Sequence, residues 1–368
     1  MRRATIAQML LAGPDERETH AGTGRSSTAT ASRYMLPRHP SQAAIRVPIT
    51  RPALSAIRIA LWPNSIVPLD LETMTYERDG RVARITLDRP ERGNGITLEM
   101  PRELAACVER ANLDPEVHAI GLAGNGSGFC GGYDLVASAE GMSEGFGTEE
   151  IPAGSPLDPG VMAANHDPSQ VWDPVVDFQM MWRNVRGFMS LFWSEKPVVC
   201  KVHGFCVAGG TDMALCSDLL VVAEDARIGY PPARVWGVPT TALWVHRLGP
   251  ARAKRLLLTG DSLTGRQAVD WGLATDWAPP GELDRAFEDL LERIARIPVN
   301  QLVMHKLQAN STVLSQGLLQ TQAMSTFFDG IARHTQEGHA FVQRAAEAGW
   351  REAVRERDEP FGDSAFGA

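Results

Sequence analysis

Two glycine-rich segments, 124–135 and 203–213, constrain the fold and the chemistry of this chain more than any other feature. Each follows an apolar run typical of a strand, at 117–123 and 198–202, and each leads into a segment that can begin a helix. Glycine permits tight turns and lets the main chain approach a ligand closely. Because the first turn of a helix leaves N–H groups unpaired and partly positive, two such loops can aim two donors at one oxygen. Stabilising an oxyanion requires that arrangement.

The composition is that of a globular protein without a nucleic-acid or membrane partner. The 368 residues allow two domains, or one domain with appendages, and 44% apolar residues suffice for a core. A net charge of −8 gives no general attraction to nucleic acid or to an anionic membrane. No apolar run reaches the ~18 residues of a membrane-spanning helix. The five cysteines are odd in number and lack metal-ligand spacing, so we expect no metal site and a reduced, cytoplasmic protein.

Residues 1–73 differ in composition from the rest of the chain. They are rich in Ser, Thr, Pro, Ala and Arg, and their hydrophobic periodicity is weak. A leader rich in Arg and Ser can be a targeting peptide, but the acidic residues near the start argue against one. We expect a disordered extension or a start codon assigned too far upstream, with the folded chain beginning at Met74.

From Met74 onward the pattern is that of an α/β protein. Apolar runs and alternation predict strands at 83–87, 117–123, 198–202 and 219–223. Amphipathic patterns predict helices beginning at Thr97, over 175–194, over 283–297, and twice in the last 60 residues. Between them, Pro250 and Thr264 are typical of helix starts, and Gly260 and Gly272 of the positions just past helix ends.

This pattern divides the chain into an α/β core at 74–296 and a helical C-terminal region at 297–368. The stretch 138–174 is rich in Gly, Pro, Ser, Asp and Glu, and we expect an insertion there. It is either a surface loop or a lid over a binding pocket, and the composition slightly favours the loop.

Five segments then occur in order along the chain. They are Asp-Arg-Pro-Glu-Arg-Gly-Asn-Gly-Ile at 88–96, Phe-Cys-Gly-Gly-Tyr-Asp-Leu at 129–135, Lys-Pro-Val-Val through Ala-Gly-Gly-Thr-Asp at 196–212, Leu-Leu-Thr-Gly at 257–260 and Ala-Val-Asp-Trp-Gly-Leu-Ala at 268–274. Together they resemble the crotonase (enoyl-CoA hydratase/isomerase) superfamily, from Met74 to Asp363. One glycine loop is a weak signal, but this ordered set is a specific one.

The resemblance implies a crotonase-like spiral of ββα units with a helical C-terminal region, assembled as a homotrimer or a dimer of trimers. It also implies an acyl-CoA thioester as substrate and no permanently bound cofactor. The N–H groups of Tyr133 and Gly209 fall at the positions of the family's two oxyanion donors. We therefore expect them to polarise the thioester carbonyl and to stabilise the enolate formed beside it.

The acid and base of the reaction are less clear. Typical hydratases of this family use two glutamates, and residue by residue these positions fall on Asp212 and Pro232. Aspartate keeps the carboxylate, whereas proline has no proton to give or take. Asp212 is therefore either a lone acid/base with a raised pKa or a carboxylate that serves the dipole of its own helix. We favour catalysis because of its place in the second loop.

Other expected site residues follow from the resemblance. Tyr230 and Arg234 lie in the segment that lines the family's acyl pocket, and Thr240 follows where relatives place further catalytic groups. Arg234 either holds an acidic acyl group or is a surface arginine, and Thr240 either positions water or caps a helix.

The coenzyme A part of the substrate is expected near the first loop. Relatives hold the adenine end with main-chain contacts around this loop, which points to Gly132 and Leu135, while Arg92 is placed to meet phosphate. We expect Asp134 to cap a helix rather than to act in catalysis. Arg344 matches a basic position that some relatives use for the nucleotide.

Function follows from the oxyanion donors and from the departure at Pro232. Enoyl-CoA hydration is the leading interpretation. Double-bond isomerisation, decarboxylation or hydrolysis on the same scaffold are alternatives, because they need the same donors and differ in the groups that handle protons. A non-catalytic acyl-CoA-binding relative is the remaining alternative.

Overall fold

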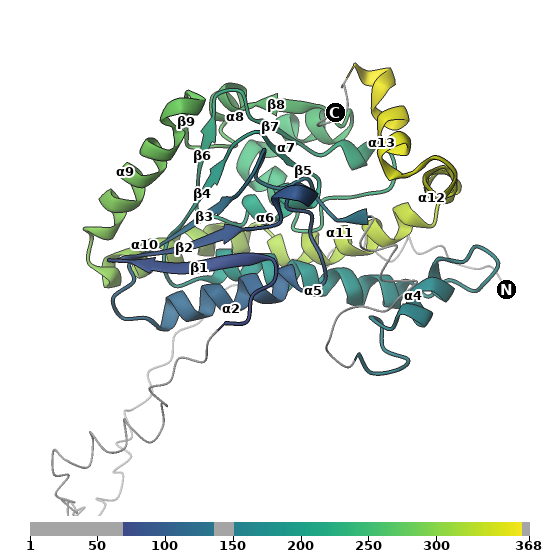
Figure 1. Ribbon diagram of the computed structural model, residues 1–368, viewed down its shortest axis with the longest axis horizontal. Helices are drawn as coiled ribbons and strands as arrows, with labels where there is room; N and C mark the ends of the chain where they lie inside the picture. Colours follow the sequence, from purple (N-terminus) through teal and green to yellow (C-terminus); the bar gives the residue numbers. More distant parts are fainter. Residues whose placement is uncertain (1–68, 136–150, 363–368) are drawn as a thin grey trace, which may run out of the picture. The chain divides into compact units, whose positions relative to one another are not determined.

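Parallel strands form the centre of the molecule (Figure 1). The structure is a computed structural model and describes residues 69–135 and 151–362. Its larger sheet has six strands in the order β1-β2-β3-β4-β6-β9. These are β1 Met74–Asp79, β2 Val82–Leu87, β3 Ala119–Gly124, β4 Val198–Val202, β6 Leu219–Ala223 and β9 Asp276–Ala278. β1 pairs antiparallel with β2, and the other neighbours in this sheet pair parallel.

A second sheet of three strands lies beside the first. Its order is β5-β7-β8, with β5 at Phe205–Val207, β7 at Arg227–Gly229 and β8 at Ser262–Thr264. The succession strand, strand, helix recurs as β1-β2-α2, β4-β5-α6 and β6-β7-α7. These helices are α2 Met100–Leu113, α6 Gly209–Ala214 and α7 Leu243–Leu257. The recurrence confirms the expected crotonase-like arrangement of ββα units.

The predicted strands are confirmed as β2, β3, β4 and β6. All six residues of β3 are buried, as expected for a parallel strand covered on both faces. One covering helix is α9 Leu283–Ala295, which crosses β3 at Gly121. A Cβ at Gly121 would lie 2.9 Å from the side chains of Phe287 and Leu291, so the helix needs glycine there. Figure 1 shows α2 and α5 Pro174–Trp193 running together below the sheet.

Helix ends follow the local chemistry of the sequence. Thr264 caps α8 Gly265–Trp271 through a capping box with Gln267, and Gly272 ends the helix in the left-handed conformation. Within α7 the chain kinks at Gly249, so Pro250 begins the second part, as its position predicts. Short 3₁₀ turns join the larger elements: η2 Pro90–Arg92, η3 Pro231–Arg234, η4 Pro280–Glu282 and η5 Glu359–Phe361.

The insertion is more ordered than its composition suggests. Residues 136–150 lie outside the described part of the chain, but the rest contains α4 Pro159–His166, which Asp158 caps. Met162 of this helix is buried in a cluster with Met180 and Met181 of α5, and Tyr133 packs against the cluster. The expected surface loop is thus, over its described part, packed next to the first glycine loop.

The described part of the C-terminal region, residues 297–362, contains four α-helices, whereas two were expected in the last 60 residues of the chain. They are α10 Val299–Ser315, α11 Leu318–Arg333, α12 Gln336–Ala348 and α13 Trp350–Asp358. Gly317 and Gly349, both with positive φ, separate α10 from α11 and α12 from α13. α11 packs along α5, and α12 packs on α13. Over the described ranges, no helix combines the length and apolar character needed to cross a bilayer.

Candidate active site

The two glycine loops lie side by side and are hydrogen-bonded to each other. The N–H groups of Phe129 and Cys130 donate to the carbonyl of Phe205 at 2.9 and 3.2 Å. In return, the N–H of Val207 donates to the carbonyl of Cys130 at 3.1 Å. These bonds fix the register of one loop on the other and bring Tyr133 next to Gly209.

This contact requires glycine at three positions. Gly132 has φ +97°, and a Cβ there would lie 2.7 Å from the Cβ of Ala208 and 3.4 Å from the nitrogen of Gly209. A Cβ at Gly209 would lie 2.8 Å from the ring of Tyr133, and one at Gly210 would lie 2.5 Å from a main-chain oxygen of the first loop. The loops touch only because these side chains are absent.

The main-chain direction leaves two N–H groups available. Ile96 bridges to Tyr133, and the bridge uses the carbonyl of Gly132 at 2.8 Å and the N–H of Asp134 at 3.0 Å. The N–H of Tyr133 therefore points away from Ile96. Gly209 is the first residue of α6, where helix N–H groups have no partner in their own helix. Within residues 69–135 and 151–362, neither N–H has a hydrogen-bond acceptor.

Asp212 lies three residues into the same helix and is completely buried. Its Oδ1 accepts hydrogen bonds from the N–H and the hydroxyl of Thr241, at 3.0 and 2.8 Å. Its Oδ2 has no partner among the described residues. Burial raises the pKa of this carboxyl to about 7, against the lowering effect of the Thr241 hydrogen bonds. The group can therefore hold or release a proton near neutral pH.

Further polar atoms around Asp212 are buried without partners in the described part of the chain. They are the hydroxyls of Tyr133 and Thr240. Burial and the charge of Asp212 raise the pKa of the Tyr133 and Tyr230 phenols well above the usual range. Both phenols therefore remain protonated and can donate hydrogen bonds. An unsatisfied buried polar group is costly, so this set is complementary to a polar ligand or to water.

The second family position offers no acid or base. Pro232 stands in η3, and a Cβ at Gly237 would lie 2.8 Å from it and 3.4 Å from the hydroxyl of Tyr230. The 230–237 segment is thus folded tightly on itself beside the Tyr230 ring.

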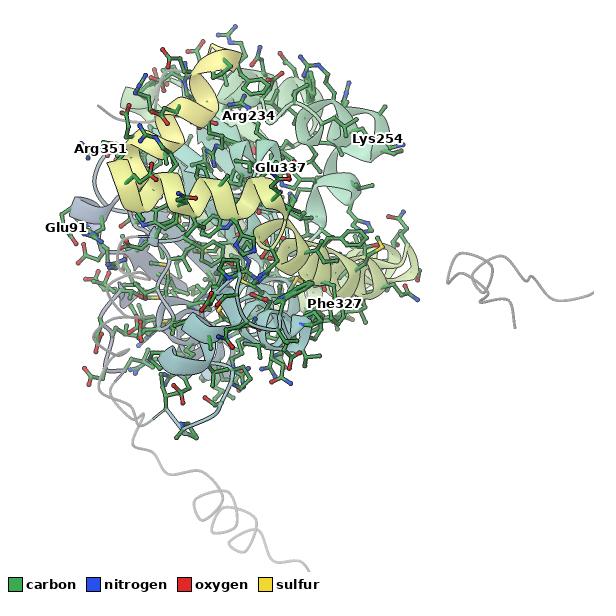
Figure 2. The ribbon with its side chains drawn as sticks, turned by 90° about the vertical axis from the view of Figure 1, so that its right-hand side faces the viewer. Glu91, Arg234, Lys254, Phe327, Glu337 and Arg351 are labelled. Carbon is green, nitrogen blue, oxygen red and sulfur yellow. The ribbon has the colours of Figure 1, made fainter. Side chains whose placement is uncertain are left out.

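Arg234, expected in the acyl pocket, is instead bound to the C-terminal helices. Its guanidinium pairs with Asp358 of α13 at 3.0 Å, donates to the carbonyl of Thr259 at 3.0 Å and stacks on Phe361 at 4.1 Å. Figure 2 shows its label beside the yellow C-terminal helices. Only 3% of the side chain is exposed. The residue ties the 230–237 segment to α13, which accounts for its burial without a ligand.

The residues expected to hold coenzyme A fall into two groups. Asp134 accepts a bidentate pair of hydrogen bonds from Arg92, at 2.9 and 3.1 Å, and another from Arg89 at 3.0 Å. These two arginines form a partly exposed cationic edge next to the first loop. Arg344, by contrast, is bound on the surface to Glu356 at 2.7 and 2.8 Å.

A further group of charged residues near Asp212 was missed from the sequence. Asp329 and Arg333 lie one turn apart on α11, and both are buried. Oδ2 of Asp329 lies 3.4 Å from Nη2 of Arg333. Arg333 also lies 3.1 Å from Asp177 of α5, which accepts a hydrogen bond from His334 at 2.9 Å. The signal that could have found them is an acid and a base four residues apart in an otherwise apolar stretch.

Comparison with known proteins adds to this geometry. Residues 77–152 and 176–351 match the profile of the family described as enoyl-CoA hydratase/isomerase. A putative enoyl-CoA hydratase, EchA13, of Mycobacterium tuberculosis is 31% identical over 287 residues, which are 74% of this chain and 82% of the relative. The (E)-benzylidenesuccinyl-CoA hydratase of Thauera aromatica is 26% identical, over 75% of this chain and 98% of that one. A crystal structure of an enoyl-CoA hydratase from Mycobacterium smegmatis superposes with a TM-score of 0.75 at 56% identity, over 82% of this chain and 98% of the other.

Proposed function

The chain belongs to the enoyl-CoA hydratase/isomerase family, and from that premise we propose that it adds water to the double bond of a 2-enoyl-CoA thioester and removes it in reverse. It is an enzyme of the hydratase type, a lyase, on the crotonase scaffold. Coenzyme A enters as part of the substrate, and no separate cofactor takes part. The names of its relatives, which include a putative enoyl-CoA hydratase and an (E)-benzylidenesuccinyl-CoA hydratase, support this substrate class.

The thioester carbonyl is held between the N–H groups of Tyr133 and Gly209. The observation that carries this proposal is the contact of the two loops, with both N–H groups free of acceptors in the described part of the chain. As water adds at C3, negative charge develops on the thioester oxygen, and two fixed donors stabilise it without reorganising. Removing one such donor typically costs about 3–4 kcal/mol of transition-state stabilisation.

Asp212 transfers the proton at C2. Its free Oδ2 and its pKa of about 7 suit a group that must both hold and release a proton. Thr241 holds the other oxygen, so the carboxyl has one orientation.

The cationic edge of Arg89 and Arg92 meets the phosphates of coenzyme A. Its position beside the first loop puts phosphate recognition on the same side as the oxyanion donors.

Isomerisation of the double bond is the second candidate. The observation that favours it is Pro232, since a single carboxylate can move one proton between C2 and C4 but cannot also activate water.

Mass spectrometry in heavy-oxygen water separates these possibilities. With crotonyl-CoA, we expect the acyl group to gain one water that carries the heavy oxygen, and the Asp212→Asn variant to lose this reaction. With 3-hexenoyl-CoA, a shifted double bond without water would name the isomerase. If neither thioester changes while coenzyme A thioesters still bind, the chain is an acyl-CoA-binding relative and the proposal is wrong.

We also propose a cytoplasmic homotrimer or dimer of trimers. All five cysteines are free thiols and buried, which suits a reducing compartment. Large apolar side chains are about half exposed on the outer faces of α10 and α11, namely Met304, Leu307, Leu319, Met324, Phe327, Phe328 and Ile331. Figure 2 labels Phe327 at the surface of α11. Such a patch favours contact with another copy of the chain, and light scattering gives the mass of the assembly.

A further inference from the structure

Hydration needs two proton transfers, and the second glycine loop supplies one carboxylate. One group must take a proton from water as it attacks C3, and another must give a proton to C2. Asp212 can do one of these, and Pro232 can do neither. We propose that Asp329 of α11 is the second carboxylate of this active site and takes the proton from the attacking water. The inference rests on the proposed hydration.

α11 is hydrogen-bonded to the segment that orients Asp212. The amide of Gln322 donates to the carbonyl of Thr241 at 3.0 Å, and Oδ1 of Asp329 accepts the N–H of Val238 at 3.2 Å. Thr241 in turn holds Asp212. The two carboxylates therefore bind opposite ends of one short turn, 238–241, which fixes their relative position. Figure 1 shows α11 beside α5, where the two helices pack below the loops.

Asp329 and Tyr230 approach the same segment, since Asp329 accepts the N–H of Val238 and a Cβ at the adjacent Gly237 would lie 3.4 Å from the Tyr230 hydroxyl. The charge of Asp329 raises the pKa of Asp212, of the Tyr133 phenol and of the Tyr230 phenol. The unpartnered hydroxyls of Tyr133 and Thr240 belong to this group as well. They provide the hydrogen bonds that a water held for attack on C3 needs.

The surroundings of the two carboxylates assign their roles. Burial raises the pKa of the Asp329 carboxyl, and the guanidinium of Arg333 at 3.4 Å and the N–H of Val238 oppose this by stabilising its anion. Asp177, on the other side of Arg333, keeps that guanidinium in place at 3.1 Å. Asp212 has no cation among its partners, only Thr241. The pair therefore holds one proton, with Asp212 as the acid and Asp329 as the base.

The step then balances. An O–H bond of water breaks and its proton passes to Asp329, while the oxygen forms a bond to C3. The electron pair of the C2=C3 bond moves into the enolate, whose oxygen lies between the N–H groups of Tyr133 and Gly209. The enolate takes the proton of Asp212 at C2. Return of one proton from Asp329 to Asp212 completes the cycle without an outside reagent.

The Asp329→Asn variant tests the assignment. An asparagine keeps the size and can still accept the N–H of Val238, but it cannot take a proton. We expect the hydration rate of crotonyl-CoA to fall ~10²- to 10⁴-fold, the usual effect of losing a general base. Exchange of the C2 hydrogen of butyryl-CoA with heavy water needs only Asp212 and the loop N–H groups. We expect this exchange to stay within about threefold of the wild-type rate, which also shows that the variant is folded.

Asp358→Asn is the matched control, because Asp358 of α13 is also a buried aspartate that is paired with an arginine, Arg234. Both of its rates should remain near wild type. If the hydration rate of Asp329→Asn stays within threefold of the wild-type rate, the assignment is wrong. If the variant loses hydration and C2 exchange to the same extent, Asp329 has a structural role and the assignment is also wrong. If the wild-type protein exchanges the C2 hydrogen but hydrates no enoyl-CoA, the proposed function itself fails. That outcome is separate, since it needs no variant.

Discussion

Asp212 makes a quantitative prediction about stability. Its carboxyl has a pKa of about 7 in the folded chain, against the usual 3.8. Below about pH 4 the group is protonated in both folded and unfolded chains, so it does not affect stability there. Between pH 4 and 7 the unfolded chain releases this proton first. The free energy of unfolding therefore falls by about 1.4 kcal/mol per pH unit, or about 4 kcal/mol in total.

The Asp212→Asn variant removes this penalty. Asparagine can keep the hydrogen bonds from Thr241 but does not ionise, so the variant should be more stable than wild type above pH 7 and inactive in C2 exchange. We expect its advantage in the free energy of unfolding to be about 3 kcal/mol larger at pH 8 than at pH 5. Urea unfolding at the two pH values, at one protein concentration, measures this.

The exposed Asp276→Asn is the control, and its effect should not change with pH beyond about 0.5 kcal/mol, the usual range of surface substitutions. An equal effect of Asp212→Asn at pH 5 and pH 8 would refute the reasoning. It would mean that the carboxyl ionises in the folded chain as easily as in water, and that its burial does not prepare it for proton transfer.

Two other substitutions test the geometry of the loops. Gly210→Ala places a Cβ 2.5 Å from a main-chain oxygen of the first loop, so the substitution should lower the free energy of unfolding by about 1–3 kcal/mol and abolish turnover. Gly281→Ala is the control, because its Cβ meets nothing within 4 Å, and it should change neither stability nor turnover. Thermal melts measure the stability and rate assays the turnover. Thr241→Val removes one hydrogen bond to the Asp212 carboxylate. The pH midpoint of C2 exchange should rise by roughly 0.7 unit, the equivalent of ~1 kcal/mol, and a fall would contradict the assignment.

The sequence predicted those features that depend on neighbours along the chain. Strands at 83–87 and 198–202 follow from their apolar runs. The cap at Thr264 and the stop at Gly272 follow from backbone conformations that their residue types favour. The convergence of two loops was predicted from the resemblance and from glycine content, and the close approach at Gly132 and Gly210 shows the physical reason for that content.

Features that depend on distant pairing were not predicted. Arg234 was expected either to hold an acidic acyl group or to be a surface arginine, because nothing near it in sequence indicates that Asp358 of α13 binds it. Only two helices were expected in the last 60 residues, because the break at Gly349 separates two helices of similar periodicity. The part of the insertion that forms α4 was expected to be a loop, because its composition does not show its contacts with Met180, Met181 and Asp177 of α5. Tertiary contacts determine each of these outcomes.

The absence of a glutamate at Pro232 and the burial of a carboxylate at Asp329 are both accounted for if Asp329 is the second proton carrier of the active site. Burying an ionisable group with incomplete hydrogen bonding lowers stability, and this chain does so twice within one electrostatic neighbourhood, at Asp212 and Asp329. A purely structural role for Asp329 would be served equally by an asparagine, which also accepts the N–H of Val238 and does not ionise. Arg333, which also pairs with Asp177 at 3.1 Å, lies 3.4 Å from Asp329 and favours its anionic form. A scaffold that has lost one proton carrier from its loops thus has another on the helix that covers them.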